Sequence, residues 1–216
     1  IACHHKNMAQ IFQNEDDRKL FSQFKIMREE DVELIPGSGV DMDAFTPQPE
    51  PSGPPVISVA TRLLGDKGVR EFVKAARTIK QTHPDARFIL AGTPDPKNPE
   101  TIRDEELAAW RREGIVELPG FVTDIAGLYA QSHIVVLPSY REGMPKGLLE
   151  AAAAGRPIVT TDVPGCRVTV EDGVTGFLVP ARTVQPLAEA MLRLIEDAAL
   201  RQKMGAAGRN RAEDMF

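Results

Sequence analysis

Cysteine is scarce in this sequence, and the common spacings of metal ligands are missing. The 216 residues include two cysteines, Cys3 and Cys166, too few for a disulfide framework, so we expect a reducing, cytoplasmic environment. No Cys-x-x-Cys or His-x-x-x-His spacing occurs, which argues against a structural zinc ion. The adjacent His4 and His5 have no third ligand nearby, so we expect an exposed turn near the terminus instead of a metal site.

Long apolar runs and an excess of positive charge are also missing. No stretch approaches the roughly 18 apolar residues of a membrane-spanning helix, and no charged and apolar leader resembles a signal peptide. The 26 Lys and Arg residues against 31 Asp and Glu give a net charge of −5, which argues against a broad nucleic-acid-binding surface. With 42% apolar residues, the chain can bury one substantial core as a globular protein.

The N-terminal quarter of the chain has a pattern of its own. Asn14 and the three acids after it predict a helix that runs to about Phe24, because an Asn side chain and negative charge both favour a helix N-terminus. A short strand is predicted at residues 32–36, followed by a glycine turn. The proline-dense stretch at residues 47–55 is typical of an interdomain linker, because proline disrupts both strands and helices.

Beyond this linker, short apolar runs alternate with helical patterns. The run VISVA at residues 56–60 is typical of a strand buried on both faces. Apolar residues at helical spacing follow from Val69 to Ile79. This alternation predicts an α/β fold with a Rossmann-like, doubly wound parallel sheet. We expect the other strands at residues 87–92, 115–118, 133–138, 157–161 and 175–179, and the other helices at 100–112, 125–131, 184–195 and 200–211.

The turn after the first strand of this sheet carries two basic side chains. Neither Gly-x-Gly-x-x-Gly nor the P-loop pattern is present, which argues against a nicotinamide cofactor and against a P-loop nucleotide. Arg62 and Lys67 follow the strand directly, at the edge where open α/β sheets bind ligands. Their charges could together neutralise a diphosphate. The alternative is that they are ordinary surface charges paired with Asp66 or Glu71.

The segment YREGMPKGLLE at residues 140–150 follows an expected strand and opens a helix. Pro145 suits the first helical position, because it has no N–H to lose there. The amides of Lys146 and Gly147 would then face an anion at the helix N-terminus. Gly143 and Gly147 would let a ligand approach the backbone closely.

Two carboxylates, Glu142 and Glu150, stand on either side of this turn. A carboxylate about one turn into the helix, such as Glu150, fits a ribose diol, while Glu142 could accept from the hydroxyls of a second sugar. The alternative is that Glu142 pairs with Arg141 or Lys146 and that Glu150 only decorates the helix. Basic groups, a helix N-terminus and two spaced carboxylates together indicate a nucleotide diphosphate-sugar as the ligand.

These residues lie within a longer family resemblance. The stretch EGMPKGLLEAAAAGRPIVTTDVPGCRVTVEDGVTGFLVP resembles the donor site of retaining glycosyltransferases of family 4 (glycosyl transferase group 1), which have the GT-B architecture of two Rossmann-like domains. The motifs IPGSGVDMDAF, TRLLGDKGVREFV, LAGTPDP and LPGFVTDI extend the resemblance over most of the chain. The most similar members are bacterial enzymes of surface-polysaccharide and lipid-linked oligosaccharide synthesis, which transfer an N-acetylhexosamine or a hexose from a UDP-sugar.

The resemblance implies a role for each candidate residue. Arg62 and Lys67 would contact the diphosphate and stabilise the leaving group, Glu150 would bind the ribose, and Glu142 would orient the donor sugar. The other donor-binding positions would contribute mainly backbone groups: Gly143 and Met144 to the sugar, Lys146 and Gly147 to the distal phosphate, and Gly120, Phe121 and Val122 to the base.

Two positions qualify this assignment. Many family members have Gly where this chain has Pro145, which removes one amide from the sugar region. Phe121 could equally be a core aromatic as a stacking surface for the base. In this family retention is usually drawn as front-face attack, with the leaving diphosphate oxygen taking the acceptor proton, so we expect no covalent nucleophile.

The resemblance also implies a domain plan. Residues 1–46 would be the end of an N-terminal acceptor domain with its linker, residues 47–205 the nucleotide-sugar domain, and residues 206–216 the start of a crossover segment. Because the sequence begins with Ile1, we expect a fragment that binds the donor and cannot transfer the sugar alone.

The expected partners are a UDP-sugar donor and a lipid-linked or saccharide acceptor, with no metal, no further cofactor and no nucleic acid. A lipid acceptor would place the enzyme in the cytoplasm, at the inner face of the cytoplasmic membrane. Three alternatives remain open. These are a nucleotide-sugar epimerase of the same architecture, a non-catalytic nucleotide-binding or assembly module, and an NAD-binding domain, which the missing glycine motif disfavours.

Overall fold

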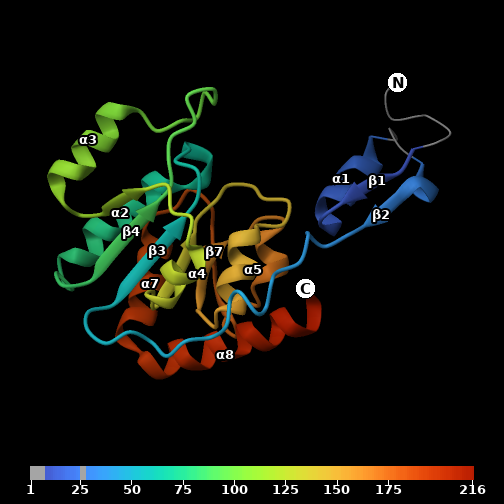
Figure 1. The fold of residues 1–216 in the computed structure, drawn as a ribbon. Helices are drawn as coiled ribbons and strands as arrows, with labels where there is room; N and C mark the ends of the chain where they lie inside the picture. Colours follow the sequence, from blue (N-terminus) through green and yellow to red (C-terminus); the bar gives the residue numbers. More distant parts are fainter. Residues whose placement is uncertain (1–7, 25–27) are drawn as a thin grey trace.

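The computed structural model describes residues 8–24 and 28–216 and contains an α/β domain preceded by a small N-terminal unit (Figure 1). The main sheet has six parallel strands in the order β5-β4-β3-β6-β7-β8. This arrangement confirms the predicted doubly wound, Rossmann-like sheet. Its strands are β3 (Val56–Ala60), β4 (Arg87–Ala91), β5 (Glu117–Gly120), β6 (Ile134–Leu137), β7 (Ile158–Thr161) and β8 (Gly176–Val179).

Helices cover both faces of the sheet, because alternate strand residues are apolar on both sides. On β6, Val136 joins one buried cluster while Val135 and Leu137 join the other. The first cluster is completed by α2 (Val69–Lys80), α3 (Asp104–Glu113) and α7 (Gln185–Glu196). The second is completed by α4 (Ile125–Ala130), α5 (Lys146–Ala153), α6 (Cys166–Thr169) and α8 (Ala198–Met215).

The chain order reverses between β3 and β6, the two central strands of the sheet. From β3 the chain builds outward through β4 to β5, and then returns through α4 to β6. A crevice outside the carboxyl ends of the strands forms at such a reversal. The short 3-10 helix η2 (Gly65–Lys67) follows β3 at this edge, and α5 follows β6.

The N-terminal unit pairs β1 (Gln10–Phe12) in parallel with β2 (Val32–Leu34), with α1 (Glu15–Gln23) and the 3-10 helix η1 (Glu29–Asp31) between them. The predicted cap is confirmed, because Asn14 Oδ1 accepts from the Asp17 amide at 2.8 Å. The strand β1 was not predicted, because three residues are too few to show a strand period. Cys3, His4 and His5 lie outside the described residues.

The proline-dense linker forms no helix or strand, as predicted, and runs along the α/β domain in contact with it (Figure 1). Arg156 Nη2 donates to the Gln48 carbonyl at 3.0 Å. The Arg201 guanidinium donates to both Glu50 carboxylate oxygens at 2.9 and 3.0 Å. Arg209 Nη1 donates to the carbonyls of Met42 and Phe45. Residues 42–50 are therefore fastened to the domain by three arginines.

Some element boundaries differ from the prediction. The helix expected at residues 100–112 begins at Asp104, and the strand expected at 115–118 lies at 117–120. Pro145 is the N-cap of α5 instead of its first helical residue, with an extended backbone at φ −75° and ψ 105°. The four-residue helix α6 was not predicted, because four residues carry no periodic signal.

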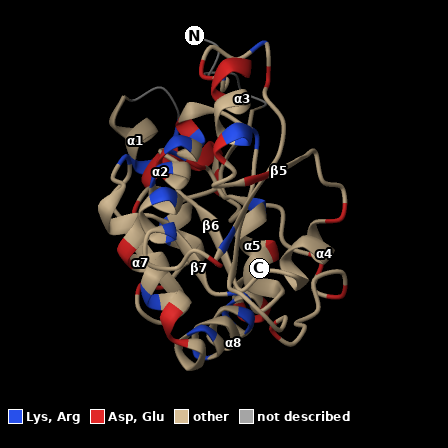
Figure 2. Ribbon diagram, turned by 90° about the vertical axis from the view of Figure 1, so that its left-hand side faces the viewer, with Lys and Arg blue, Asp and Glu red and all other residues tan. Residues whose placement is uncertain are grey.

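Charge is mixed along the helices. Basic and acidic segments are interspersed over the domain in the view of Figure 2. Among the helices of residues 8–24 and 28–216, none is both long and apolar enough to cross a bilayer.

Candidate functional site

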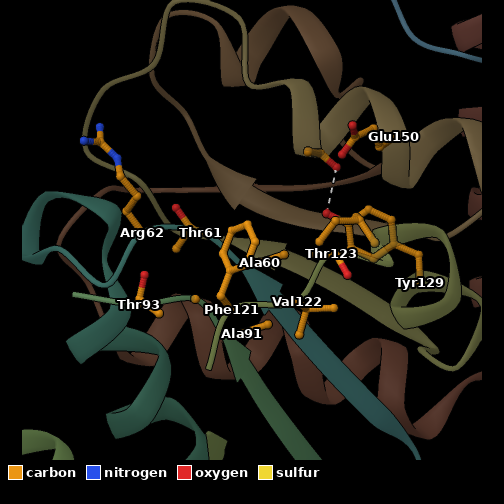
Figure 3. Close-up of a pocket in the computed structure, with 13 residues that line it drawn as sticks. Ala60, Thr61, Arg62, Ala91, Thr93, Phe121, Val122, Thr123, Tyr129 and Glu150 are labelled. Atoms are coloured by element: carbon orange, nitrogen blue, oxygen red, sulfur yellow. Dashed lines mark hydrogen bonds between the residues drawn. The ribbon is translucent and has the colours of Figure 1, made fainter. Parts of the chain in front are cut away.

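A pocket of about 510 Å³ opens at the carboxyl edge of the sheet, beside the crevice between β3 and β6. Small residues at the ends of β3 and β4 form its floor, which keeps the backbone open to a ligand. Its walls come from the loop after β5 and from α4 and α5 (Figure 3). The lining residues are Ala60, Thr61, Arg62, Ala91, Gly92, Thr93, Phe121, Val122, Thr123, Ile125, Tyr129, Gly147 and Glu150.

Five of the predicted site residues line this pocket: Arg62, Phe121, Val122, Gly147 and Glu150. Arg62 and Glu150 lie at opposite ends of the labelled residues, with the Phe121 ring between them in the view of Figure 3. Phe121 is 74% exposed, so the interpretation as a core aromatic is wrong. The fold therefore presents a basic group, a flat apolar ring and a carboxylate to one cavity.

Glu150 is a nearly buried carboxylate near the middle of α5. Its side chain is 13% exposed and lies 3.5 Å from Lys146 Nζ, which is itself 65% exposed. Burial raises the Glu150 pKa above its usual range, and the Lys146 charge partly opposes that shift. Such a carboxylate is poorly solvated and gains from hydroxyl donors.

Tyr129 is a pocket residue that the sequence analysis did not identify. Its hydroxyl donates to the Gly147 carbonyl at 3.1 Å, which links α4 to the first turn of α5 (Figure 3). The side chain is buried, and burial raises the Tyr129 pKa, so the hydroxyl stays a donor. A Cβ at Gly147 would lie 3.2 Å from this oxygen, so a larger residue there would have to displace the Tyr129 hydroxyl by a few tenths of an ångström.

Lys67 and Glu142 form an ion pair at the same sheet edge. Lys67 Nζ lies 2.7 Å from Glu142 Oε1, and each side chain is 15% exposed. The alternative partners expected from the sequence are therefore wrong for both residues. Neither side chain lines the pocket described above. The pair joins η2 to the loop before α5.

The remaining basic candidate, Arg62, has a different partner from those expected. Its guanidinium lies 3.3 Å from Asp95 Oδ2 and is 61% exposed. An exposed pair of this kind contributes little to stability. Arg62 can therefore exchange this partner for another anion at small cost.

The loops after β3 and β6 are packed together through their backbones. The Tyr140 amide donates to the Asp66 carbonyl at 2.8 Å. Gly68 has φ +69°, and a Cβ there would overlap the Pro138 carbonyl oxygen. This close approach fixes Lys67 beside the segment that carries Glu142.

Two further predicted positions are Met144, in the loop of Glu142, and Gly120, at the end of β5. Met144 is 8% exposed, so it contributes to the core as well as to the loop. A Cβ at Gly165 would overlap the carbonyl oxygens of Glu142 and Gly143, so the turn before α6 supports the loop from behind. Gly120 has φ +81°, and its carbonyl accepts from the Gly92 amide at 2.8 Å.

Three threonines of the pocket, Thr61, Thr93 and Thr123, were also not predicted. The first two directly follow the predicted strands at residues 56–60 and 87–92, so a search for polar residues at strand ends would have found them. They add hydroxyl groups to the pocket rim.

The described residues offer no grouped set of three His, Cys, Asp or Glu side chains that could hold a metal ion. Cys166 is free and buried, and burial raises its pKa to about 11. Its thiol is therefore protonated at neutral pH and unsuited to act as a nucleophile.

Known proteins with similar sequences share this domain. Residues 54–197 match the family "Glycosyl transferases group 1". A capsular polysaccharide biosynthesis glycosyltransferase, CapM, of Staphylococcus aureus is 30% identical over 161 residues, covering 74% of this chain and 42% of that protein. An N,N'-diacetylbacillosaminyl-diphospho-undecaprenol alpha-1,3-N-acetylgalactosaminyltransferase of Campylobacter jejuni is 34% identical over 160 residues, covering 74% and 40%.

A solved structure agrees with these relatives. The Anabaena protein Alr3699/HepE, crystallised with UDP and glucose, superimposes with a TM-score of 0.84 at 25% identity, covering 96% of this chain and 59% of that chain. The chain spans less than half the length of the two curated relatives. By its sequence match and its Rossmann-like fold, the chain belongs to the glycosyl transferases group 1 family of GT-B enzymes.

Proposed function

We propose that this chain is the donor-binding half of a retaining glycosyltransferase that takes the sugar from a UDP-sugar, either UDP-N-acetylhexosamine or UDP-hexose. The observation that carries the proposal is the pocket at the sheet edge, where Phe121, Gly147 and the nearly buried Glu150 carboxylate meet. The HepE structure contains UDP, which supports a uridine nucleotide as the ligand class.

The nucleotide would lie along the pocket. The exposed Phe121 ring offers a stacking surface for the base, and Glu150 would accept from the ribose hydroxyls. The amides of Lys146 and Gly147 are the first two of α5, which have no acceptor within the helix. They would therefore donate to a phosphate at the positive end of the helix.

The two residues of the Lys67–Glu142 pair would have different roles: Lys67 would stabilise charge on the diphosphate, and Glu142 would orient the sugar. A diphosphate at this edge competes with Glu142 for the Lys67 ammonium, which would stabilise the leaving group as its charge develops. Glu142, once released, would accept from hydroxyls of the donor sugar. Arg62 would add a second cation to the diphosphate. The acceptor proton would pass to the leaving phosphate oxygen, without a covalent enzyme intermediate.

The acceptor is proposed to be lipid-linked or a saccharide. The Campylobacter relative is named for a diphospho-undecaprenol substrate, which supports a lipid-linked acceptor for the complete enzyme. Such an acceptor would place the enzyme in the cytoplasm at the inner face of the cytoplasmic membrane. We propose that neither a metal ion nor a further cofactor is needed.

Calorimetry of the chain with UDP, UDP-N-acetylglucosamine and UDP-glucose tests this function. We expect UDP to bind with and without EDTA and NADH not to bind. Absence of UDP binding would refute the proposal, and loss of binding in EDTA would refute metal independence. In the complete enzyme, NMR of the product should show the same anomeric configuration as the donor.

Replacing the buried carboxylate by an amide, Glu150→Gln, should weaken UDP-N-acetylglucosamine binding by about 10- to 30-fold, because hydrogen bonds to a charged acceptor are stronger than those to a neutral one. The wild-type affinity should fall as pH is lowered through the raised Glu150 pKa, since protonation removes the acceptor. The variant should bind independently of pH over that range. Calorimetry at several pH values measures both effects.

The control for this variant is Glu189→Gln, which changes an exposed Glu on α7 that accepts from Gln185. It should bind like the wild type. Because burial raises the folded-state pKa of Glu150, its charge opposes folding at neutral pH, so Glu150→Gln should be at least as stable as the wild type. Weaker binding together with lower thermal stability would contradict a binding role.

A further inference from the structure

Asn14, at the start of α1 in the N-terminal unit, contacts the loop that carries Glu142. Its Nδ2 donates to the Gly143 carbonyl at 2.8 Å. Its Oδ1 accepts from the Asp17 amide at 2.8 Å. The side chain is 2% exposed. Nδ2 also donates to Asp17 Oδ2 at 2.9 Å. Since carbonyl and carboxylate oxygens accept and a backbone N–H only donates, these partners determine which way the Asn14 side-chain amide points.

The loop is enclosed from two sides at Gly143. A Cβ at this position would overlap Gln13 Oε1, which precedes α1. On the other side, Gly165 approaches the carbonyl oxygens of Glu142 and Gly143. The Gly143 peptide therefore lies between the N-terminal unit and the turn before α6.

Two ion pairs hold α1 against this region. Asp17 Oδ1 lies 2.6 Å from Arg141 Nη2, and Asp16 Oδ2 lies 2.7 Å from Arg167 Nη1. The arginine side chains are 62% and 47% exposed, so screening by salt makes each pair weak. The buried Asn14 bond is therefore, of these contacts from α1 and its cap, the one that water and salt screen least.

We propose that Asn14 is a positioning residue, which fixes the Gly143 peptide and thereby aims Glu142 at the donor sugar. This assignment rests on the proposed function for the role of Glu142. Asn14 lies in the N-terminal unit, outside the matched family segment at residues 54–197. It would act on the sugar and leave the nucleotide pocket unchanged, because its hydrogen-bond partners, Asp17 and Gly143, are not among the residues that line that pocket.

The substitution Asn14→Asp separates this bond from the helix cap. Aspartate caps a helix as well as asparagine does, so the bond from the Asp17 amide is kept. The donor to the Gly143 carbonyl is lost, together with the 2.9 Å bond from Nδ2 to Asp17 Oδ2. Hydrogen exchange of the chain should show amides at residues 142–148 exchanging about tenfold faster. The β-sheet amides should be unchanged.

The matched control is Asn98→Asp. Asn98 Oδ1 also accepts from a backbone amide, that of Glu100 at 2.9 Å, so the control adds the same charge and keeps the same type of bond. It should leave exchange at residues 142–148 unchanged. Asn14→Ala removes the helix cap and the Gly143 bond together. Amides at residues 142–148 should therefore exchange as fast as in Asn14→Asp, and the amides of α1 should also exchange faster than in the wild type.

Binding gives the second readout. Asn14→Asp should keep its UDP affinity within about twofold of the wild type and lose about tenfold in affinity for whichever of UDP-N-acetylglucosamine or UDP-glucose binds more tightly than UDP. Unchanged exchange at residues 142–148, or equal losses for UDP and the UDP-sugar, would overturn the proposal. If wild-type protein binds no UDP, the proposed function fails, while the exchange result still decides whether Asn14 holds the loop.

Discussion

Transfer by the complete enzyme should fall about 100- to 1,000-fold in Lys67→Ala, the loss typical when one group that stabilises developing negative charge is removed. Lys67 is 15% exposed and 2.7 Å from Glu142, so its charge acts where water screens it little. Glu142→Ala should lower transfer strongly as well, because the sugar loses its orienting acceptor. UDP release under saturating donor measures both rates.

The two variants should differ in donor binding. Lys67→Ala should weaken UDP itself, whereas Glu142→Ala should affect mainly the UDP-sugar, since Glu142 is assigned to the sugar. The control is Lys74→Ala, which removes an exposed charge from α2. Wild-type transfer rates in both Lys67→Ala and Glu142→Ala would refute the site assignment.

Stability should fall by about 3–5 kcal/mol in Gly68→Ala, which combines a left-handed backbone with a steric overlap. Gly68 has φ +69°, and the added Cβ would meet the backbone carbonyl of Pro138. Since neither backbone segment can move without disturbing β6 or η2, the overlap is not easily relieved. Urea unfolding, with the midpoint compared at equal slope, measures the loss.

Gly114→Ala is the matched comparison for the steric part of this effect. Gly114 ends α3 with φ +64°, and no atom lies within 4 Å of a Cβ built there. Its substitution should therefore cost only the backbone strain, about 1–2 kcal/mol. Equal losses in the two alanine variants would show that the packing of Gly68 against Pro138 contributes nothing.

The sheet could be predicted from the sequence because its strands are continuous apolar runs. The prediction for β3 matches its observed bounds, Val56–Ala60, since a strand buried on both faces needs apolar residues throughout. The range predicted for β5 was two residues too early, since the strand lies at Glu117–Gly120. This edge strand alternates exposed and half-buried positions and so has no continuous apolar run. β1 was missed, since its burial depends on pairing with β2, which is distant in the chain.

The site could be predicted as a set of residues and not as a set of contacts. The positions at strand ends and at the start of α5 placed Arg62, Gly147 and Glu150 near one cavity. The partner of Lys67 lies 75 residues further along the chain, so it follows from the packing of two loops and not from any local pattern. The exposure of Phe121 likewise depends on where the loop after β5 points.

The three arginines that bind residues 42–50 limit where the N-terminal unit can rotate relative to the α/β domain. Because residues 42–50 are hydrogen-bonded to the α/β domain, we expect any rotation of the N-terminal unit to occur before Met42, where Gly37 and Gly39 have φ +70° and +76°. A Cβ at Gly37 would lie 2.6 Å from Met144 Cγ. This segment therefore lies against the loop of Glu142, so a displacement of the N-terminal unit would reach that loop directly and not through the sheet.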